Sequence, residues 1–374
     1  MKCTNEALSW YIAAALPFAF GLFWPLLLLP WSLLVGFFIY QQFIAPTYVN
    51  AAGKVVYVTG CDSGFGQAVA LALDQKGCYV FAGCLEPESE GADCMRAQAS
   101  DRLRVLDLDV TNDEKVKKCA QQIEKFCAEN HLQGLWGLYN NAGIATAGEI
   151  EWLQMEEYKR SMDVNLWGAV RVTKSVLPSI RATKSHLQGD LKRNRDNGLT
   201  CIAKSTFSLY YILILHIPAI TKSAVDAFAN TLRHEMRKFD VKVSTIQPGN
   251  FSGVTDMFKE MSGRIDKVYD HLDEEVKSVY GNEYLSAFKN GICLKFTKEG
   301  TAPEFKTMQE VSESVMDALF SDRPRPRYKP AQFWWIVWWW VYETLPEFLT
   351  DRLMVYWQRH LPRPAGAQPG PASQ

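Results

Sequence analysis

KVVYVTGCDSGFGQAVALALDQKG, residues 54–77, joins a β-branched apolar run to a helical pattern through a glycine-rich turn. The first run predicts a buried strand, and the apolar residues after the turn recur at helical spacing. Gly60, Gly64 and Gly66 lie in the turn itself. Glycines at this position let the backbone approach a pyrophosphate, and the unpaired N–H groups at the helix N-terminus attract its negative charge. Because strand, turn and helix follow in order, the stretch indicates a dinucleotide site rather than a chance glycine turn.

The same alternation of apolar runs and helical patterns continues along the chain. Further runs are CYVFAGCL, LRVLDLDV and LWGLYNNAG, and amphipathic segments such as NDEKVKKCAQQIEKFCAEN separate them. Strands of continuous apolar character are typical of a parallel sheet that helices cover on both faces. We therefore predict an α/β domain with a Rossmann-type doubly wound sheet over residues 53–322.

Composition limits the kind of protein further. The chain has 374 residues with a formal charge of −1 and 48% hydrophobic residues, enough for one catalytic-size domain with flanking segments. Because no basic stripe is concentrated anywhere, we exclude nucleic acid as a partner. The nine cysteines show neither CxxC pairing nor histidines at metal-ligand spacing, so we expect free thiols in a reducing compartment and no metal site.

Residues 1–50 predict a membrane anchor. No charged residue occurs from residue 7 to residue 53, and the apolar part, 7–44, is longer than a signal-peptide core or one straight membrane pass. Pro17, Pro25 and Pro30 interrupt it, so we expect one tilted, kinked span or a hairpin of two. A buried core helix is the alternative, although charge-free segments of this length are uncommon in soluble domains.

Residues 325–361 predict a second membrane-associated segment. Six tryptophans lie between Trp334 and Trp357, but the apolar run 331–342 is too short to span a bilayer. Because indole rings favour the headgroup layer, we expect an interfacial segment. An aromatic lid or a dimer contact is the alternative. Residues 362–374 predict a disordered tail.

Three further motifs follow the glycine turn in order: NNAG at 140–143, MDVNLWG at 162–168 and QPGNF at 247–251. With TGxxxGxG they resemble the short-chain dehydrogenase/reductase family. The stretches GLWGLYNNAGI and VNLWGAVRVTKSVLP resemble its branch that contains D-β-hydroxybutyrate dehydrogenase, retinol dehydrogenases and 17β-hydroxysteroid dehydrogenase type 2. The resemblance implies a Rossmann-type fold and hydride transfer between NAD(H) or NADP(H) and an alcohol or carbonyl. It also implies a homo-oligomer.

The resemblance assigns roles to individual residues. Asn165 would support a proton relay, Lys222 would lower the pKa of a neighbouring acid, and Ser205 falls at the position of the substrate-binding serine. Asp62 in the glycine turn would repel a 2′-phosphate, so the expected cofactor is NAD rather than NADP. The cofactor-binding positions are Thr59, Gly60, Asp62, Ser63, Gly64, Phe65, Gly66, Asp109, Asn141, Ala142, Gly143, Lys222, Pro248 and Gly249.

One position departs from the family pattern. The family's proton-transferring tyrosine would stand four residues before Lys222, because a lysine one helical turn away lowers its pKa. The sequence has Pro218 there, which has no ionisable proton. Residues 185–218 depart from the pattern as a whole, which suggests an alternative or misassigned exon, although 198–205 could still form the fifth strand. His216 is a weak surrogate proton carrier, since a lone histidine beside an apolar run is usually surface or packing.

Several functional hypotheses remain open at this point. The chain is either a membrane-associated NAD-dependent oxidoreductase that interconverts a secondary alcohol and a ketone, or a catalytically impaired NAD-binding isoform. The substrate would be a steroid or retinoid, which the anchor favours, or 3-hydroxybutyrate, which the C-terminal resemblance favours. The expected location is the endoplasmic reticulum membrane, with the mitochondrial inner membrane as the alternative. Loss of the central fifth strand would instead leave sheet edges unpaired and prevent folding.

Overall fold

A computed structural model of the chain describes residues 32–34, 36–37, 46–190, 199–203, 216–249, 251, 261–296, 308–331, 344–358, 362 and 364–366. The chain divides into two units, Met1–Thr47 and Tyr48–Gln374. Most of the anchor predicted for the first unit, and most of the tryptophan-rich segment, lie outside the described residues. Within the described ranges, no helix is both long enough and apolar enough to cross a membrane.

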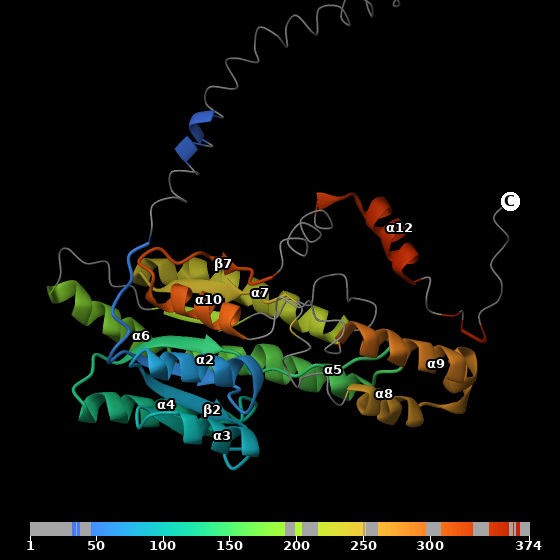
Figure 1. Cartoon of the computed structure of the whole chain (residues 1–374), viewed down its shortest axis with the longest axis horizontal. Coiled ribbons are helices and arrows are strands. Elements are labelled where there is room, and N and C mark those ends of the chain that lie inside the picture. The colour runs from blue at the N-terminus through green and yellow to red at the C-terminus, as the bar shows by residue number, and fades with distance from the viewer. Residues whose placement is uncertain are drawn as a thin grey trace, which may run out of the picture. The chain divides into compact units, whose positions relative to one another are not determined.

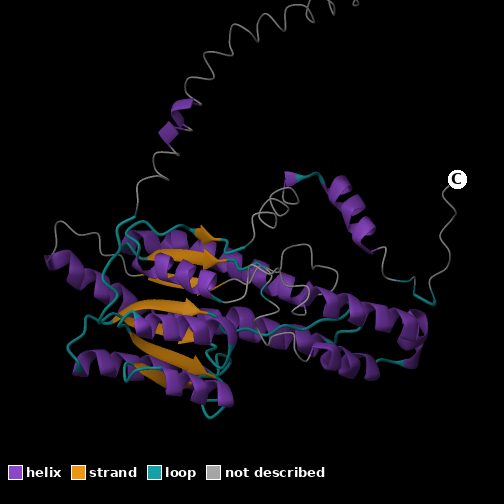
Figure 2. Cartoon of the chain, in the orientation of Figure 1, coloured by secondary structure: helices purple, strands orange, loops and turns teal. Residues whose placement is uncertain are grey.

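The second unit is built around a parallel sheet with helices packed on it (Figures 1 and 2). Its seven strands run in the order β3-β2-β1-β4-β5-β6-β7. This order, with β1 beside both β2 and β4, is the doubly wound arrangement that the sequence predicts. The strands are β1 (Val55–Thr59), β2 (Tyr79–Cys84), β3 (Leu103–Asp107), β4 (Leu135–Asn140), β5 (Leu199–Ala203), β6 (Lys242–Ile246) and β7 (Arg327–Tyr328).

Helices cover the sheet on both faces and form two separate cores. One core packs α2 and α10 against one face, and the other packs α4, α6 and α7 against the opposite face. Further helical segments follow β4 and β6. The helices are α2 (Gly64–Gln75), α3 (Glu90–Gln98), α4 (Asp113–Glu129), α5 (Met155–Met162), η1 (Asp163–Gly168), α6 (Ala169–Asp190), α7 (His216–Met236), η3 (Arg237–Phe239), α8 (Met261–Asp270), α9 (Glu274–Phe296), α10 (Gln309–Phe320) and α12 (Glu347–Gln358).

Local sequence explains why these elements form. All five residues of β1 are buried, which accounts for its unbroken apolar pattern between two covered faces. In α4, the buried residues recur every three or four positions, and Asn112 caps the helix by accepting the N–H groups of Glu114 and Lys115.

The altered segment still supplies the fifth strand. β5 lies between β4 and β6, with Leu199 opposite Gly137 and Ala203 opposite Ile246. The strand that the sequence permits at 198–205 is therefore present at 199–203. Because the central position is filled, the unpaired sheet edges that would prevent folding do not occur here.

A third, aromatic core lies beyond the sheet and was not predicted from the sequence. Trp152 is 1% exposed, and the rings of Tyr269, Tyr280, Tyr284 and Phe288 surround it at centroid distances of 5.0–6.1 Å. All four surrounding rings belong to α8 and α9. The core therefore attaches this helical pair to the segment that follows the NNAG motif.

Candidate functional site

The glycine turn and the NNAG motif are hydrogen-bonded to each other at the carboxyl ends of β1 and β4. The Thr59 hydroxyl oxygen accepts the backbone N–H groups of Asn141 and Ala142 at 3.0 and 3.1 Å. In return, Nδ2 of Asn141 donates to the carbonyls of Thr59 and Gly60 at 3.1 and 2.9 Å. Because Thr59 is 1% exposed, these bonds are shielded from water and hold the two loops in one arrangement.

The glycines of the turn are required by its backbone geometry. Gly60 and Gly64 have φ angles of +69° and +63°, a region that side chains disfavour. A Cβ on Gly60 would lie 2.7 Å from Cα of Ala142, and a Cβ on Gly66 would overlap the Gly60 carbonyl. The turn thus brings the N-terminus of α2 against the loop after β4 with no side chain between them. This arrangement fits a pyrophosphate, which binds backbone N–H groups at a helix N-terminus.

Asp62 places a negative charge beside the end of β2. Its carboxylate accepts the backbone N–H groups of Leu85 and Glu86 at 3.1 and 2.9 Å. The guanidinium of Arg96 on α3 is paired with Asp93 at 2.6 Å. The Asp62 carboxylate therefore lies at the carboxyl end of β2, the strand next to β1. In this fold an acidic residue at that position contacts the ribose of a dinucleotide.

Asn165 connects three elements at the other side of the site. Its Oδ1 accepts the N–H of Ile144 at 2.8 Å, and its Nδ2 donates to the Ile144 carbonyl and to the Thr221 hydroxyl, each at 3.0 Å. Asn165 lies in η1, a π-helical turn between α5 and α6. Such turns often occur at functional sites, because the extra residue redirects side chains. The sequence analysis did not predict a role for Thr221. The only feature of the sequence that could have indicated one is that Thr221 directly precedes Lys222.

Lys222 and Asn165 meet at Gly143 of the NNAG motif. A Cβ built on Gly143 would lie 3.1 Å from Oδ1 of Asn165 and 3.3 Å from Nζ of Lys222. Lys222 is 9% exposed and lies on α7. The structure therefore brings together three sequence-predicted residues that are far apart in the chain, and it does so at the carboxyl edge of the sheet.

The tyrosine position of the family pattern falls in the first turn of α7. Pro218 is the third residue of this helix and precedes Lys222 by one turn. A proline is tolerated there because the first N–H groups of a helix have no partner within the helix. Ser205 lies outside the described residues, and His216 is the first residue of α7.

The remaining predicted positions flank the same edge. Oδ1 of Asp109 accepts the N–H and the hydroxyl of Thr111 at 2.9 and 2.7 Å, so this carboxylate shapes the loop between β3 and α4. Ser63 is the N-cap of α2, and its side chain makes no capping hydrogen bond. The ring of Phe65 packs edge-on against Phe251, with centroids 5.4 Å apart.

The loop after β6 is hydrogen-bonded to the segment that follows β7. The N–H of Gly249 donates to the Pro330 carbonyl at 2.9 Å, and a Cβ on Gly249 would lie 2.8 Å from Cβ of Ala331. Pro248 and Gly249 therefore run close along the segment that follows β7. Together with the Phe65–Phe251 contact, this places the Pro-Gly loop beside the glycine turn.

Two buried thiols lie near the glycine turn but are not suited to chemistry. Burial raises the pKa of Cys84 to about 12, with a further contribution from the Asp62 carboxylate. Burial also raises the pKa of Cys61 well above its ordinary value. Because the thiolate is the nucleophile, both groups stay protonated and unreactive near neutral pH.

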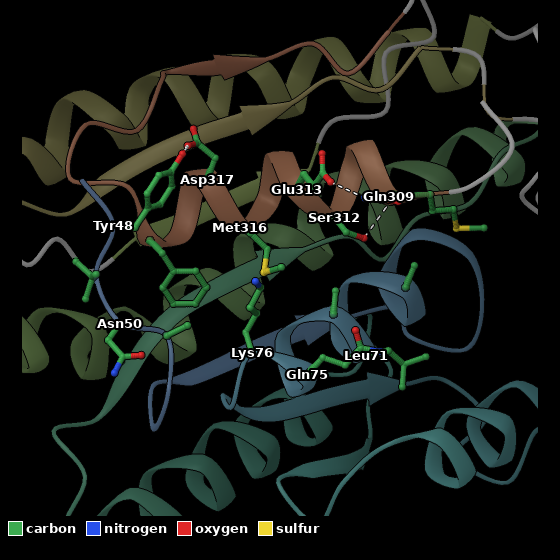
Figure 3. Close-up of a pocket in the computed structure, with 16 residues that line it drawn as sticks. Tyr48, Asn50, Leu71, Gln75, Lys76, Gln309, Ser312, Glu313, Met316 and Asp317 are labelled. Atoms are coloured by element: carbon green, nitrogen blue, oxygen red, sulfur yellow. Dashed lines mark hydrogen bonds between the residues drawn. The ribbon is translucent and has the colours of Figure 1, made fainter. Parts of the chain in front are cut away.

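A separate groove of about 960 Å³ lies between α2 and α10, on one face of the sheet (Figure 3). Leu71 and Met316 contribute apolar surface, and Lys76, Glu313 and Asp317 contribute charge. None of the predicted cofactor-binding or catalytic residues lines it. The groove is therefore distinct from the site at the carboxyl edge.

Comparison with known proteins identifies the family. The family model described as short chain dehydrogenase matches residues 54–265, more than half of the chain. The chain is 36% identical over 310 residues to mitochondrial D-beta-hydroxybutyrate dehydrogenase of Rattus norvegicus, covering 82% of this chain and 85% of that protein. It is 32% identical to retinol dehydrogenase 7 of Mus musculus, covering 90% and 96%.

A solved structure supports the fold. The short chain dehydrogenase/reductase of Burkholderia phymatum, in complex with NAD, matches with a TM-score of 0.56 and 17% identity, covering 77% of this chain and 92% of that one. The family and the branch expected from the motifs are thus confirmed. This chain belongs to the short-chain dehydrogenase family.

Proposed function

We propose that this chain is a membrane-associated, NAD-dependent oxidoreductase that interconverts a secondary alcohol and a ketone by hydride transfer. One observation carries the proposal: Asn165 Oδ1 and Lys222 Nζ converge on Gly143 at the same sheet edge as the glycine turn. A dinucleotide bound at the turn would extend across β4 toward these two side chains. No other part of the described chain combines a phosphate-binding turn with a buried lysine in this way.

Particular residues would hold the cofactor. The N-terminus of α2, left open by Gly60 and Gly64, would bind the pyrophosphate. Asp62 would accept a hydrogen bond from the adenosine ribose and repel a 2′-phosphate, which favours NAD over NADP. When bound, the cofactor supplies the hydride acceptor or donor. Lys222 would hold a positive charge beside the reacting end, and Asn165 would fix the loop around Gly143.

The proton step separates this chain from an ordinary family member. Reduction of a ketone requires a proton at the carbonyl oxygen, and the family pattern delivers it from the position that Pro218 occupies. Because proline carries no such proton, water in the site would have to supply it. We therefore expect hydride transfer that is slow but dependent on Lys222.

A second candidate function follows from the proline at position 218. If water cannot replace the missing hydroxyl, the chain is a catalytically impaired isoform that binds NAD(H) without turnover. Pro218 favours this candidate, whereas the place of the Lys222 Nζ beside Gly143 at the carboxyl edge of the sheet favours the first.

The proposed substrate and location are inferred from the sequence of the N-terminal segment and from similarity to a relative. The charge-free segment 7–44 favours membrane association and an alcohol that partitions into lipid, such as a steroid or retinoid. The similarity to hydroxybutyrate dehydrogenase favours 3-hydroxybutyrate instead. The endoplasmic reticulum is the proposed compartment, with the mitochondrial inner membrane as the alternative.

The experiment compares three forms of the full chain in detergent: the unchanged protein, Pro218→Tyr and Lys222→Ala. NADH binding is measured by fluorescence, and single-turnover oxidation of NADH is followed with a steroid ketone and with acetoacetate. We expect all forms except Lys222→Ala to bind NADH tightly, and Pro218→Tyr to turn over one of the two ketones at least about 100-fold faster. Absence of nicotinamide nucleotide binding in the unchanged chain would contradict the proposal. Equal, unmeasurable turnover in the unchanged chain and Lys222→Ala would establish the impaired isoform.

A further inference from the structure

A short basic segment between α10 and β7 lies where the chain enters the second unit. We call residues 323–325, with Arg323 and Arg325 at the two ends, the arginine segment. Tyr48, the first residue of the second unit, forms an antiparallel bridge with Ser321, two residues before this segment. The arginine segment is therefore fixed beside the point at which the N-terminal part of the chain arrives.

Both arginines combine a fixed backbone with an exposed side chain. The N–H of Arg323 donates to the Ser321 hydroxyl at 3.1 Å. The N–H of Arg325 donates to the Tyr328 hydroxyl at 2.9 Å, and its carbonyl accepts the Ser244 hydroxyl at 2.7 Å. Both residues are exposed all the same. Hydrogen bonds of the backbone thus hold two positive charges at the surface without using the guanidinium groups.

The charges of the arginine segment are weakly compensated. Nε of Arg323 lies 3.8 Å from the Asp322 carboxylate, and the Arg323 side chain is 45% exposed. An exposed pair of this kind contributes little and can be exchanged for a stronger partner. Arg325 makes no ion pair with any residue that the structure describes. The next arginine differs, because Arg327 is paired with Asp226 of α7 at 2.9 Å.

Arg325 lies close enough to Tyr48 to influence its ionisation. A hydrogen bond to Asp317 and partial burial raise the pKa of Tyr48, and the positive charge of Arg325 opposes this shift. The Asp317 carboxylate accepts the Tyr48 hydroxyl at 2.7 Å, so this acid already has a partner. The entry point of the chain and the Arg325 guanidinium therefore belong to one surface.

The sequence on both sides indicates what this surface faces. The apolar part of the N-terminal segment ends at residue 44, so only residues 45–47 connect it to Tyr48. A fully extended chain of that length spans at most roughly 14 Å. A second apolar run, 331–342, begins six residues after Arg325. Basic residues next to membrane segments are attracted to negatively charged lipid headgroups.

We propose that Arg323 and Arg325 bind the phosphate groups of anionic phospholipids, an inference that rests on the membrane association in the proposed function. A guanidinium group binds phosphate through two parallel hydrogen bonds, a geometry that a lysine ammonium lacks. Inorganic phosphate has the same chemistry, but the place of the segment beside the chain's entry point favours the lipid. The candidate site lies at the carboxyl edge of the sheet, so lipid at the amino end of β7 would leave the cofactor site free.

The test uses the full chain reconstituted in phosphatidylcholine vesicles. The vesicles carry a small fraction of either phosphatidylserine or phosphatidylcholine with a dansyl label on the acyl chain. Energy transfer from the protein's tryptophans measures which labelled lipid gathers around the chain. We expect the unchanged chain to prefer phosphatidylserine. The double variant Arg323→Gln/Arg325→Gln should weaken this preference about fivefold per arginine, hence roughly 25-fold for the pair.

A matched control removes two positive charges elsewhere. Lys117 and Lys118 are exposed on α4, which packs against the opposite face of the sheet from α10. The variant Lys117→Gln/Lys118→Gln should keep the preference of the unchanged chain. Both double variants should bind NADH as tightly as the unchanged chain. Salt at about 1 M should remove the preference of the unchanged chain, because the screening length falls to about 3 Å.

Three outcomes would overturn the inference. One is equal energy transfer to the two labelled lipids in the unchanged chain, a result that needs no variant. Another is a preference for phosphatidylserine that persists in Arg323→Gln/Arg325→Gln. The third is loss of the preference when inorganic phosphate replaces chloride at constant ionic strength, which would assign the segment to a free anion. A full chain that does not float with phosphatidylcholine vesicles would instead contradict the proposed membrane association, so the two failures are distinguishable.

Discussion

The side-chain nitrogen of Asn165 lies 3.0 Å from the hydroxyl oxygen of Thr221, which joins η1 to α7 one residue before Lys222. The same amide group pairs with both the N–H and the carbonyl of Ile144, just after the NNAG motif. The position of the buried lysine relative to Gly143 therefore depends on one asparagine, which contacts the neighbours of both residues.

Replacement of Asn165 by alanine should destabilise the protein and weaken cofactor binding together. The change leaves the N–H and carbonyl of Ile144 and the hydroxyl of Thr221 without this partner in a buried setting, at a cost of roughly 1–3 kcal/mol in the free energy of unfolding. Urea unfolding and NADH titration provide the measurements. Asn130→Ala, at the exposed C-cap of α4, is the control and should leave NADH affinity unchanged. Full NADH affinity in Asn165→Ala would contradict the coupling.

Replacement of Gly66 by alanine should abolish dinucleotide binding. The new Cβ would overlap the Gly60 carbonyl and lie 2.6 Å from Nδ2 of Asn141, so the hydrogen-bonded turn has to move. We expect NADH affinity to fall at least about 100-fold, because the backbone N–H groups lose their alignment. Gly263→Ala is the control, since a Cβ at that helical position meets nothing within 4 Å. Its expected effect is neutral or stabilising by up to about 1 kcal/mol. Equal affinities of the two variants would argue against a phosphate site in the turn.

Replacement of Asp62 by asparagine should shift the preference between the two nicotinamide cofactors. The substitution removes the negative charge but keeps one oxygen that can accept from Leu85 or Glu86. Because the repulsion of a 2′-phosphate is lost, the ratio of NADPH to NADH affinity should rise roughly tenfold. Paired titrations with both cofactors measure it, and Asp101→Asn, an exposed aspartate before β3, is the control. An unchanged ratio would mean that Asp62 does not select the cofactor.

The buried carboxyl group of Glu149, which is hydrogen-bonded to the Tyr284 hydroxyl, should give the protein a distinct pH dependence. The two oxygen atoms of this hydrogen bond are 2.7 Å apart. Burial raises the pKa of Glu149, whereas the hydrogen bond from Tyr284 opposes this shift. A carboxyl group whose pKa is higher in the folded chain stabilises most below its ordinary pKa and loses this stabilisation as pH rises through the raised value. In Glu149→Gln, the free energy of unfolding should therefore change less with pH between the ordinary pKa of a glutamate and the raised pKa of Glu149.

Removal of the Tyr284 hydroxyl should act in the opposite direction. Without the donor, the pKa of Glu149 rises further, so Tyr284→Phe should lose more stability at neutral pH than at acidic pH. The expected loss near neutral pH is about 1.5–3 kcal/mol, typical of a hydrogen bond to a charged group. Urea unfolding of both variants across this range checks the sign. Tyr280→Phe, whose partner Glu151 is exposed, is the matched control and should show a smaller loss. A loss in Tyr284→Phe that is larger at acidic pH would contradict the assignment.

Most of the correct predictions from the sequence rest on patterns of residues that are close together in the chain. β1, the glycine turn and α2 occupy one continuous stretch, and each follows from residues close in the chain: β-branched runs, glycines with positive φ and apolar residues at helical spacing. The parallel order of the strands follows from the same local pattern, because buried strands alternating with helices allow few arrangements. Even β5, inside a segment that departs from the family, keeps the apolar run that its central position requires.

What the sequence by itself determined is therefore the fold class, the phosphate-binding turn and the family, all of which depend on neighbours in the chain. Only the tertiary structure decided that Asn165 pairs with Thr221 and that Lys222 meets Gly143. The reason is physical. Hydrogen-bond partners and burial depend on residues that are distant in sequence, and no periodicity or motif records which side chains the packed sheet brings within about 3 Å of one another.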